Sequence, residues 1–207
     1  MKHGGAYSPW FFTVEEAGGG ILMDMGCHAI ELCRWMLGKP QVVSVYADVD
    51  RFVHNAQPLD DHVMMIVEFE GRKKALVESS WTRVAGWSFR AKCMAPRALS
   101  TPKCIRREWV CRPTPRTVGR SLRKVGARRH GKASSSTAIR PRWPISSARS
   151  APGEPPLETG EDGLAVLEIM IAGYQSAATG RRIDFPFDDP GGYRSPVELW
   201  LRAEAAR

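Results

Sequence analysis

The fold of this chain is decided by residues 62–81, which read HVMMIVEFEGRKKALVESSW. Residues 62–69 and residues 75–81 are both rich in β-branched and other apolar side chains. Runs of this kind are typical of strands, and Gly71-Arg72 between them is a plausible tight turn. The stretch therefore predicts two antiparallel strands joined as a hairpin.

Further strands and a helix flank this hairpin. Residues 42–49 are β-rich and partly alternating, and residues 87–91 predict the start of a fourth strand. Apolar residues recur at helical spacing over residues 21–37, and Gly38 followed by Pro40 is a C-terminal stop signal. One helix followed by sequential strands predicts an α+β fold, with a mostly antiparallel open sheet covered by helices on one face.

The C-terminal part of the chain carries the signals of a second helical region. Thr159 and Asp162 make a capping-box-like pair at the start of a helix, and Gly180 marks its end. Ser195-Pro196 predicts the start of a final short helix, because proline is favoured at the first helical position.

The net charge of +8 is concentrated in one segment. Residues 91–150 hold 16 Lys and Arg against one acid, Glu108, whereas the rest of the chain holds 14 basic and 21 acidic residues. Arg, Pro and Ser dominate this segment, and low hydrophobicity with high charge does not favour an ordered structure. We therefore divide the chain into a folded part, 1–91, a basic segment that is disordered or irregular, 92–152, and the last part of the same domain, 153–207.

Several classes of protein are excluded by composition. No apolar run approaches the ~20 residues of a membrane span, and the first residues carry no apolar signal-peptide region. The five cysteines are odd in number and irregularly spaced, which argues against a disulfide framework and favours a reducing compartment. We expect a cytoplasmic protein that does not contact a membrane.

The most specific local pattern is the pair Asp24 and His28. Residues four apart on a helix point to the same side, one turn apart. A carboxylate beside an imidazole raises the basicity of the ring, so the pair suits proton transfer to or from a hydroxyl group. The plainer alternative is that Asp24 stabilises the helix start and that His28 is an ordinary core or surface residue. The glycines at 18–20, just before this helix, would allow the backbone to approach a ligand closely.

Other kinds of site find little support in the sequence. It contains no G-x-G-x-x-G fingerprint and no phosphate-binding P-loop, so nothing in it builds a nucleotide site. It also lacks a C-x-x-C or paired Cys/His knuckle, and we expect no metal. The basic segment would bind polyanions non-specifically, but it shows no recognisable nucleic-acid module.

A family resemblance is carried by two stretches, residues 17–38, AGGGILMDMGCHAIELCRWMLG, and residues 153–163, GEPPLETGEDG. Trp10-Phe11 precedes the first stretch, and residues 43–47 and 79–81 continue the likeness between the two. These segments closely resemble the C-terminal domain of the Gfo/Idh/MocA oxidoreductases, the relatives of glucose–fructose oxidoreductase and inositol dehydrogenase.

The resemblance implies a function and roles for individual residues. Family members oxidise or reduce sugars, cyclitols and related alcohols with NAD or NADP. By resemblance, His28 is the acid/base on the reacting hydroxyl, and Asp24 orients it or the substrate. His3 and Trp10 match a family segment that lines the substrate pocket. The open sheet of such relatives is commonly a subunit interface, so the resemblance also implies a homo-oligomer.

The chain departs from the family in two respects. The dinucleotide domain and its catalytic lysine are absent, so we expect the chain to be inactive by itself. In addition, a one-base shift in the codons for residues 93–98 yields V-Y-G-T-E-G, a turn that relatives carry at this point, and residues 142–147 shift in the same sense. We therefore predict that residues 92–152 are read out of frame, which the coding DNA tests.

Two other functions stay open at this point. The chain could be a non-catalytic oligomerisation or binding module that uses its open sheet. It could also be a basic polyanion-binding protein that acts through residues 92–152.

Overall fold

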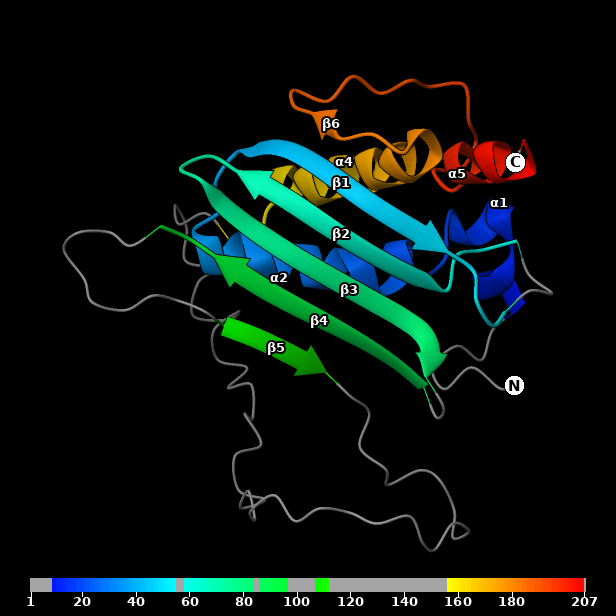
Figure 1. Ribbon diagram of the computed structural model, residues 1–207, viewed down its shortest axis with the longest axis horizontal. Coiled ribbons are helices and arrows are strands. Elements are labelled where there is room, and N and C mark those ends of the chain that lie inside the picture. Colours follow the sequence, from blue (N-terminus) through cyan, green and yellow to red (C-terminus); the bar gives the residue numbers. More distant parts are fainter. Residues whose placement is uncertain (1–8, 55–57, 84–85, 97–106, 112–155, 207) are drawn as a thin grey trace, which may run out of the picture.

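The computed structural model describes residues 9–54, 58–83, 86–96, 107–111 and 156–206. These residues form one open sheet in the strand order β5-β4-β3-β2-β1-β6 (Figure 1), and every neighbouring pair is antiparallel. The strands are β1 (Val42–Asp50), β2 (His62–Phe69), β3 (Lys73–Arg83), β4 (Gly86–Met94), β5 (Arg107–Cys111) and β6 (Ile183–Asp184).

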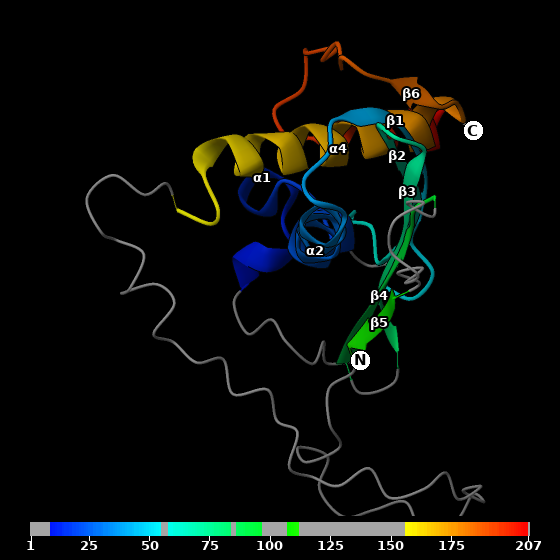
Figure 2. The same ribbon diagram turned by 90° about the vertical axis from the view of Figure 1, so that its left-hand side faces the viewer.

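The described helices lie on one side of this sheet, as the side view shows (Figure 2). Helix α2 packs against β3 and β4, and helix α4 packs against β1. The predicted α+β class, with an antiparallel open sheet covered on one face, is therefore confirmed. The helices are η1 (Pro9–Phe12), α1 (Val14–Ala17), η2 (Leu22–Gly26), α2 (Cys27–Leu37), α4 (Gly160–Thr179) and α5 (Glu198–Ala205).

The core forms between the helices and the inner face of the sheet. In β2, Val63, Met65 and Val67 are fully buried, whereas Met64 and Ile66 between them are 46% and 45% exposed. Strand side chains alternate between the two faces, so the inward set packs under α2 and α4 while the outward set stays in contact with solvent. Each fully buried side chain of this size contributes about 1.5–3 kcal/mol.

The predicted hairpin is present between β2 and β3. Gly71 and Arg72 both have positive φ angles, of 70° and 59°, and Phe69 faces Lys73 across the turn. Three residues, 70–72, therefore lie between the last paired positions, and glycine adopts the positive φ at position 71 without a steric penalty.

The predicted ends of α4 are confirmed as well. The Thr159 hydroxyl accepts a bond from the Asp162 N–H, and the Asp162 carboxylate accepts one from the Thr159 N–H at 3.0 Å. Gly180, with φ 66°, ends the helix in the left-handed region, where glycine carries no steric penalty.

Three elements differ from the prediction. The helix expected over residues 21–37 starts with a π-helical turn, η2, before it continues as α2. Helix α5 begins at Glu198 because Ser195 and Pro196 belong to the turn before it. The sequence does not predict strand β5, which lies in the basic segment and pairs with β4.

Most of the basic segment lies outside the described residues, as does His3. Residues 92–94 belong to β4 and residues 107–111 form β5, so the predicted disorder is wrong for these residues. For the rest of residues 92–152 the disorder stays a prediction, as do the reading frame and the domain boundaries that rest on them. In the part of the chain that the structure describes, no helix is long and apolar enough to cross a membrane.

Candidate functional site

The start of the helix that carries the candidate pair is anchored by Asp60. Its carboxylate accepts hydrogen bonds from the backbone N–H groups of Gly20 at 2.8 Å and Leu22 at 2.9 Å. Its carbonyl oxygen accepts a third, from the Ile21 N–H at 3.0 Å. The Tyr174 hydroxyl donates to the same carboxylate at 2.7 Å. A helix start leaves backbone N–H groups without intrahelical acceptors. Asp60 accepts hydrogen bonds from these groups in place of a local N-cap residue.

The glycines before this helix serve the same contact. A Cβ atom on Gly20 would lie 1.9 Å from the Asp60 carbonyl oxygen, and one on Gly19 would lie 2.3 Å from the Tyr174 hydroxyl. The idea that this glycine run lets backbone approach a ligand is thus wrong for these two positions, because the close neighbours are the protein's own groups.

Asp60 is sealed in the interior, with 0% of its surface exposed. Burial raises the pKa of this carboxyl, although the N–H groups of Leu22 and Gly20 and the Tyr174 hydroxyl act to lower it. Burial also raises the pKa of Tyr174, and the neighbouring carboxylate adds to that effect. Both groups are hydrogen-bonded to each other and closed to solvent, so we interpret them as a structural anchor.

Asp24 lies two residues after Leu22, the last residue whose N–H group Asp60 binds, and belongs to the π-helical turn η2. The Trp81 indole N–H of β3 donates to its Oδ2 at 3.1 Å. Burial raises the pKa of the Asp24 carboxyl, while the Trp81 hydrogen bond and the charge of His28 act to lower it. Single π-helical turns occur frequently at functional sites. Asp24 is thus half-buried, held by one oxygen, and electrostatically linked to His28.

His28 follows in the first turn of α2 and is exposed. It lines a cavity of about 580 Å³ between α2 and α4, together with Trp35 of α2 and Met170 of α4. Among the described residues, Asp24 does not line this cavity and forms no hydrogen bond with His28. The structure therefore places the pair one turn apart on one helix, as the spacing predicts, and of the two only His28 lines the cavity.

Three of the residues that line this cavity, Glu31, Glu158 and Asp162, belong to a charged cluster. The Lys39 ammonium contacts Asp162 at 2.7 Å and Glu158 at 3.0 Å, and it lies 3.8 Å from Glu31. The buried Arg34 guanidinium also pairs with Glu31 and Asp162. Carboxylate oxygens of Glu31, Glu158 and Asp162 come within 4.8 Å of one another, as metal ligands would. A metal ion would have to displace the ammonium group that these oxygens already surround.

Trp10 lies apart from the cavity, on the turn η1. It is 47% exposed, and its ring packs edge-on against Phe11, with the ring centroids 5.2 Å apart. The Phe11 ring in turn lies 5.6 Å from that of Trp81. Trp10 thus belongs to an aromatic group behind Asp24, and its predicted place in a substrate pocket stays a prediction. The same prediction for His3 falls outside the described residues.

The sequence did not predict two residues of the site: Asp60, which binds the start of the helix, and Trp81, which binds Asp24. Asp60 gives a weak signal as one of two adjacent acids that follow Pro58-Leu59. Trp81 carries a signal only as part of the family-like residues 79–81. Neither contact could be predicted from local spacing, because Asp60 lies 40 residues from Gly20 and Trp81 lies 57 residues from Asp24.

Comparison with solved structures finds the same architecture in several other proteins. GenD2 from gentamicin A biosynthesis, solved in complex with NAD, is 25% identical, with a TM-score of 0.59 over 88% of this chain and 53% of that one. A putative myo-inositol dehydrogenase from Sinorhizobium meliloti 1021 is 21% identical, with a TM-score of 0.58 over 86% and 53%. A probable dehydrogenase from Thermotoga maritima is 20% identical, with a TM-score of 0.57 over 83% and 50%. The last two likenesses show the fold alone, and none of the curated proteins matches the chain.

The chain thus spans about half the length of the solved proteins that it matches. Residues 1–95 match the family model described as GFO/IDH/MocA C-terminal domain. The resemblance noted in the sequence is therefore confirmed for this stretch of the chain.

The described residues do not fit a dinucleotide. A pyrophosphate is usually held where a glycine-rich turn joins a parallel strand to a helix. The described sheet is antiparallel throughout, and the sequence contains no G-x-G-x-x-G. What these residues supply is a cavity of about 580 Å³ with His28 among its lining residues.

Proposed function

We propose that this chain is the substrate-binding and catalytic domain of an NAD(P)-dependent oxidoreductase that acts on a sugar, a cyclitol or a related alcohol. The observation that carries the proposal is the position of His28. This residue lines a cavity of about 580 Å³ and lies one turn from a half-buried carboxylate. The family of residues 1–95 and the fold shared with dehydrogenases support it.

His28 supplies the proton half of the reaction. As a neutral imidazole it accepts the proton of the reacting hydroxyl on a ring nitrogen, and as an imidazolium it returns the proton in the reverse direction. The Asp24 carboxylate stabilises the imidazolium, because opposite charges one helix turn apart attract each other.

The hydride half of the reaction lies outside what the described residues can provide. Oxidation of an alcohol also requires a hydride acceptor, and the described part of the chain does not fit NAD or NADP. We therefore expect no turnover by the chain alone when a polyol and NAD are added, but we do expect the polyol to bind.

Binding of a polyol tests this proposal directly. Titration of myo-inositol into the isotope-labelled chain should shift the NMR signals of His28 and of other cavity residues. We expect a weak dissociation constant, on the order of 1 mM, because the described residues do not fit the cofactor beside which the polyol would bind. His28→Gln should weaken this binding, and Asp24→Asn should weaken it to a smaller extent, because Asp24 does not line the cavity.

A histidine on the other face of the sheet serves as the matched control. His62 lies on β2, with its ring 5.2 Å from that of Phe52. His62→Gln should leave the binding of myo-inositol unchanged. The absence of any shift at the cavity, or equal losses with His28→Gln and His62→Gln, would contradict the proposed function.

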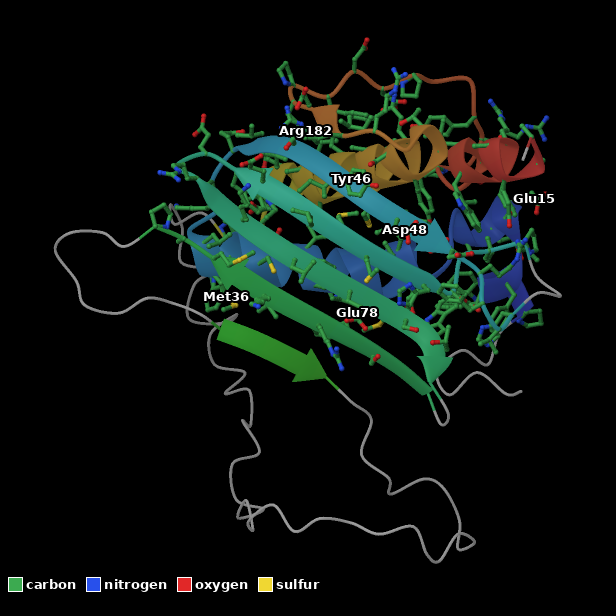
Figure 3. All side chains as sticks on the ribbon, in the orientation of Figure 1. Glu15, Met36, Tyr46, Asp48, Glu78 and Arg182 are labelled. Atoms are coloured by element: carbon green, nitrogen blue, oxygen red, sulfur yellow. The ribbon has the colours of Figure 1, made fainter. Side chains whose placement is uncertain are left out.

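A second candidate function, self-association, is favoured by the open face of the sheet. Among the described residues no helix covers this face, and Figure 3 shows Tyr46, Asp48 and Glu78 on it. The face has an apolar centre whose members are 38–46% exposed, namely Tyr46, Met64, Ile66, Leu76 and Met94.

The charges around this centre suggest a second copy of the chain as the partner. Glu68 pairs with Lys74 at 3.0 Å, and Glu78 lies 3.4 Å from Arg90. A face that carries both signs of charge around an apolar centre is compatible with itself under two-fold symmetry.

Sedimentation of the wild type and two variants tests this second function. Ile66→Lys should convert a dimer into a monomer, because it places a charge at the apolar centre. Leu164→Lys is the control, since Leu164 is 56% exposed but lies on α4. A monomeric wild type at high concentration would overturn the proposal.

A further inference from the structure

Trp81 occupies an unusual position for a core tryptophan. It is 4% exposed, and its indole N–H points to the one carboxylate oxygen of Asp24 that has a described partner. A buried indole N–H normally needs an acceptor. Here the acceptor belongs to the residue that the proposed function places beside the acid/base.

Trp81 itself is fixed from several directions. Its backbone N–H donates to the Asp61 carbonyl oxygen at 2.8 Å, and Asp61 directly follows the anchor residue Asp60. The rings of Phe11 and Phe12 lie 5.6 and 6.3 Å from its own ring.

Asp61 is equally constrained. Its buried carboxylate accepts the backbone N–H groups of Phe52, Val53 and His54, each at 2.8 Å. Burial acts to raise the pKa of this carboxyl, but these donors outweigh it and hold the pKa below the usual value. Two consecutive residues thus fix Asp24 and Trp81. The Asp60 carboxylate binds the backbone just before Asp24, and the Asp61 carbonyl oxygen binds the backbone N–H of Trp81.

We propose that Trp81 is a positioning residue for Asp24: its indole N–H holds Oδ2 and leaves Oδ1 available to interact with His28, one helix turn away. This inference rests on the proposed function. Oδ1 accepts no hydrogen bond within the described residues. A carboxylate that accepts hydrogen bonds at one oxygen keeps the other oxygen available. A carboxylate that accepts them at both oxygens, as Asp60 does, has a structural role.

The same hydrogen bond sets the charge of Asp24. Burial disfavours the carboxylate, and the Trp81 N–H favours it because a hydrogen bond to the charged form stabilises that form. His28 on the same helix acts in the same direction, and Cys27 donates its thiol to the Asp24 carbonyl oxygen. From β3, the group in contact is Trp81, which does not titrate. Loss of the indole N–H should therefore raise the pKa of Asp24 further.

The test compares Trp81→Phe with the wild type by NMR titration of isotope-labelled aspartate. We expect the pKa of Asp24 to rise in Trp81→Phe and the affinity for myo-inositol to fall roughly three- to tenfold, the effect of one lost hydrogen bond. Trp200→Phe is the matched control, because Trp200 is 3% exposed and lies on α5. It should leave both quantities unchanged.

A measurement on the wild type keeps the proposal testable if Trp81→Phe does not fold. The indole N–H resonance of Trp81 should move with pH, with the same midpoint as the Asp24 carboxyl. A Trp81 resonance that does not follow Asp24, or an unchanged Asp24 pKa in a folded Trp81→Phe variant, would overturn the inference.

These outcomes separate the inference from the proposed function. If Trp81 and Asp24 titrate together and no polyol binds, the proposed function fails while the positioning contact stands. If polyols bind equally well to the wild type and to Trp81→Phe, the inference fails and the proposed function stands.

Discussion

Two carboxylates at the start of one helix have different surroundings. Asp60 is fully buried, and its carboxylate accepts hydrogen bonds from two backbone N–H groups and from the Tyr174 hydroxyl. Asp24 is half-buried, and only its Oδ2 has a described hydrogen-bond partner, Trp81. Burial raises the pKa of both, so the direction of the shift does not distinguish them.

What distinguishes the two acids is how many of their carboxylate oxygens accept a hydrogen bond: both in Asp60, and only Oδ2 among the described contacts of Asp24. A buried carboxylate whose oxygens are all occupied is a structural component, and its loss leaves several N–H groups without a partner. A carboxylate with one oxygen left over can still accept a proton or a substrate hydroxyl. We therefore expect changes around Asp60 to alter stability, and changes at Asp24 to alter binding.

Gly20→Ala should have the largest effect. The new methyl group would collide with the Asp60 carbonyl oxygen, which is backbone and cannot rotate away. We expect the free energy of unfolding to fall by about 3 kcal/mol, as for a severe overpacking, measured by urea denaturation.

Gly163→Ala is the matched control for this change. Gly163 lies in α4 with nothing near its Cβ position, so alanine should stabilise the helix by up to about 1 kcal/mol. Equal effects of the two substitutions would show that the Gly20 contact is not tight.

Tyr174→Phe should have a smaller effect on the same anchor. It keeps the buried ring and removes only the donor to Asp60, which should cost about 1–3 kcal/mol. The pKa of Asp60 should then rise, because one of the groups that lowers it is gone. The loss should therefore be largest at neutral pH and shrink as Asp60 becomes protonated at lower pH.

Tyr193→Phe tests whether that loss is specific to the interior. The Tyr193 hydroxyl donates to the surface residue Asp189. We expect its removal to change the free energy of unfolding by less than about 0.5 kcal/mol. A comparable loss from both tyrosines would remove the distinction between the anchor and the surface.

A partly exposed carboxylate, Asp162, should show a smaller effect than Tyr174, with the same direction of pH dependence. Hydrogen bonding to Lys39 and to the Thr159 backbone lowers its pKa to about 2. A lowered pKa stabilises the fold above the unfolded pKa of about 3.9, and this contribution is lost as the pH falls through 2. Asp162→Asn should therefore be less stable than the wild type at neutral pH.

The pH dependence of that difference is the measurement. The unfolding free energies of the wild type and Asp162→Asn should converge between about pH 4 and pH 2. A difference that stays constant over this range would show that the ion pair with Lys39 contributes nothing.

Elements with local signals were predictable. The hairpin at Gly71-Arg72 and the capping box at Thr159 involve neighbours in the chain, so spacing alone locates them. The strand β5 had no such signal, because Arg107–Cys111 lies in a basic stretch and becomes a strand by pairing with β4.

The same distinction applies to the site. The four-residue spacing of Asp24 and His28 is local, and it is sufficient to place both residues on one helix. The function of the glycines before that helix could not be predicted, because Gly20 meets a loop 40 residues away. The sequence also could not show that Asp60 is a structural anchor and that Asp24 is the candidate catalytic group.

Periodicity and capping motifs in the chain were sufficient to specify the α+β class and the acid–imidazole pair, because helix and strand signals are short-range. The packing of the 60–61 loop and β3 onto the helix start decided which carboxylate is sealed and which keeps an oxygen available. That choice depends on burial and on donors contributed by distant segments, and these arise only when the sheet and the helices come together.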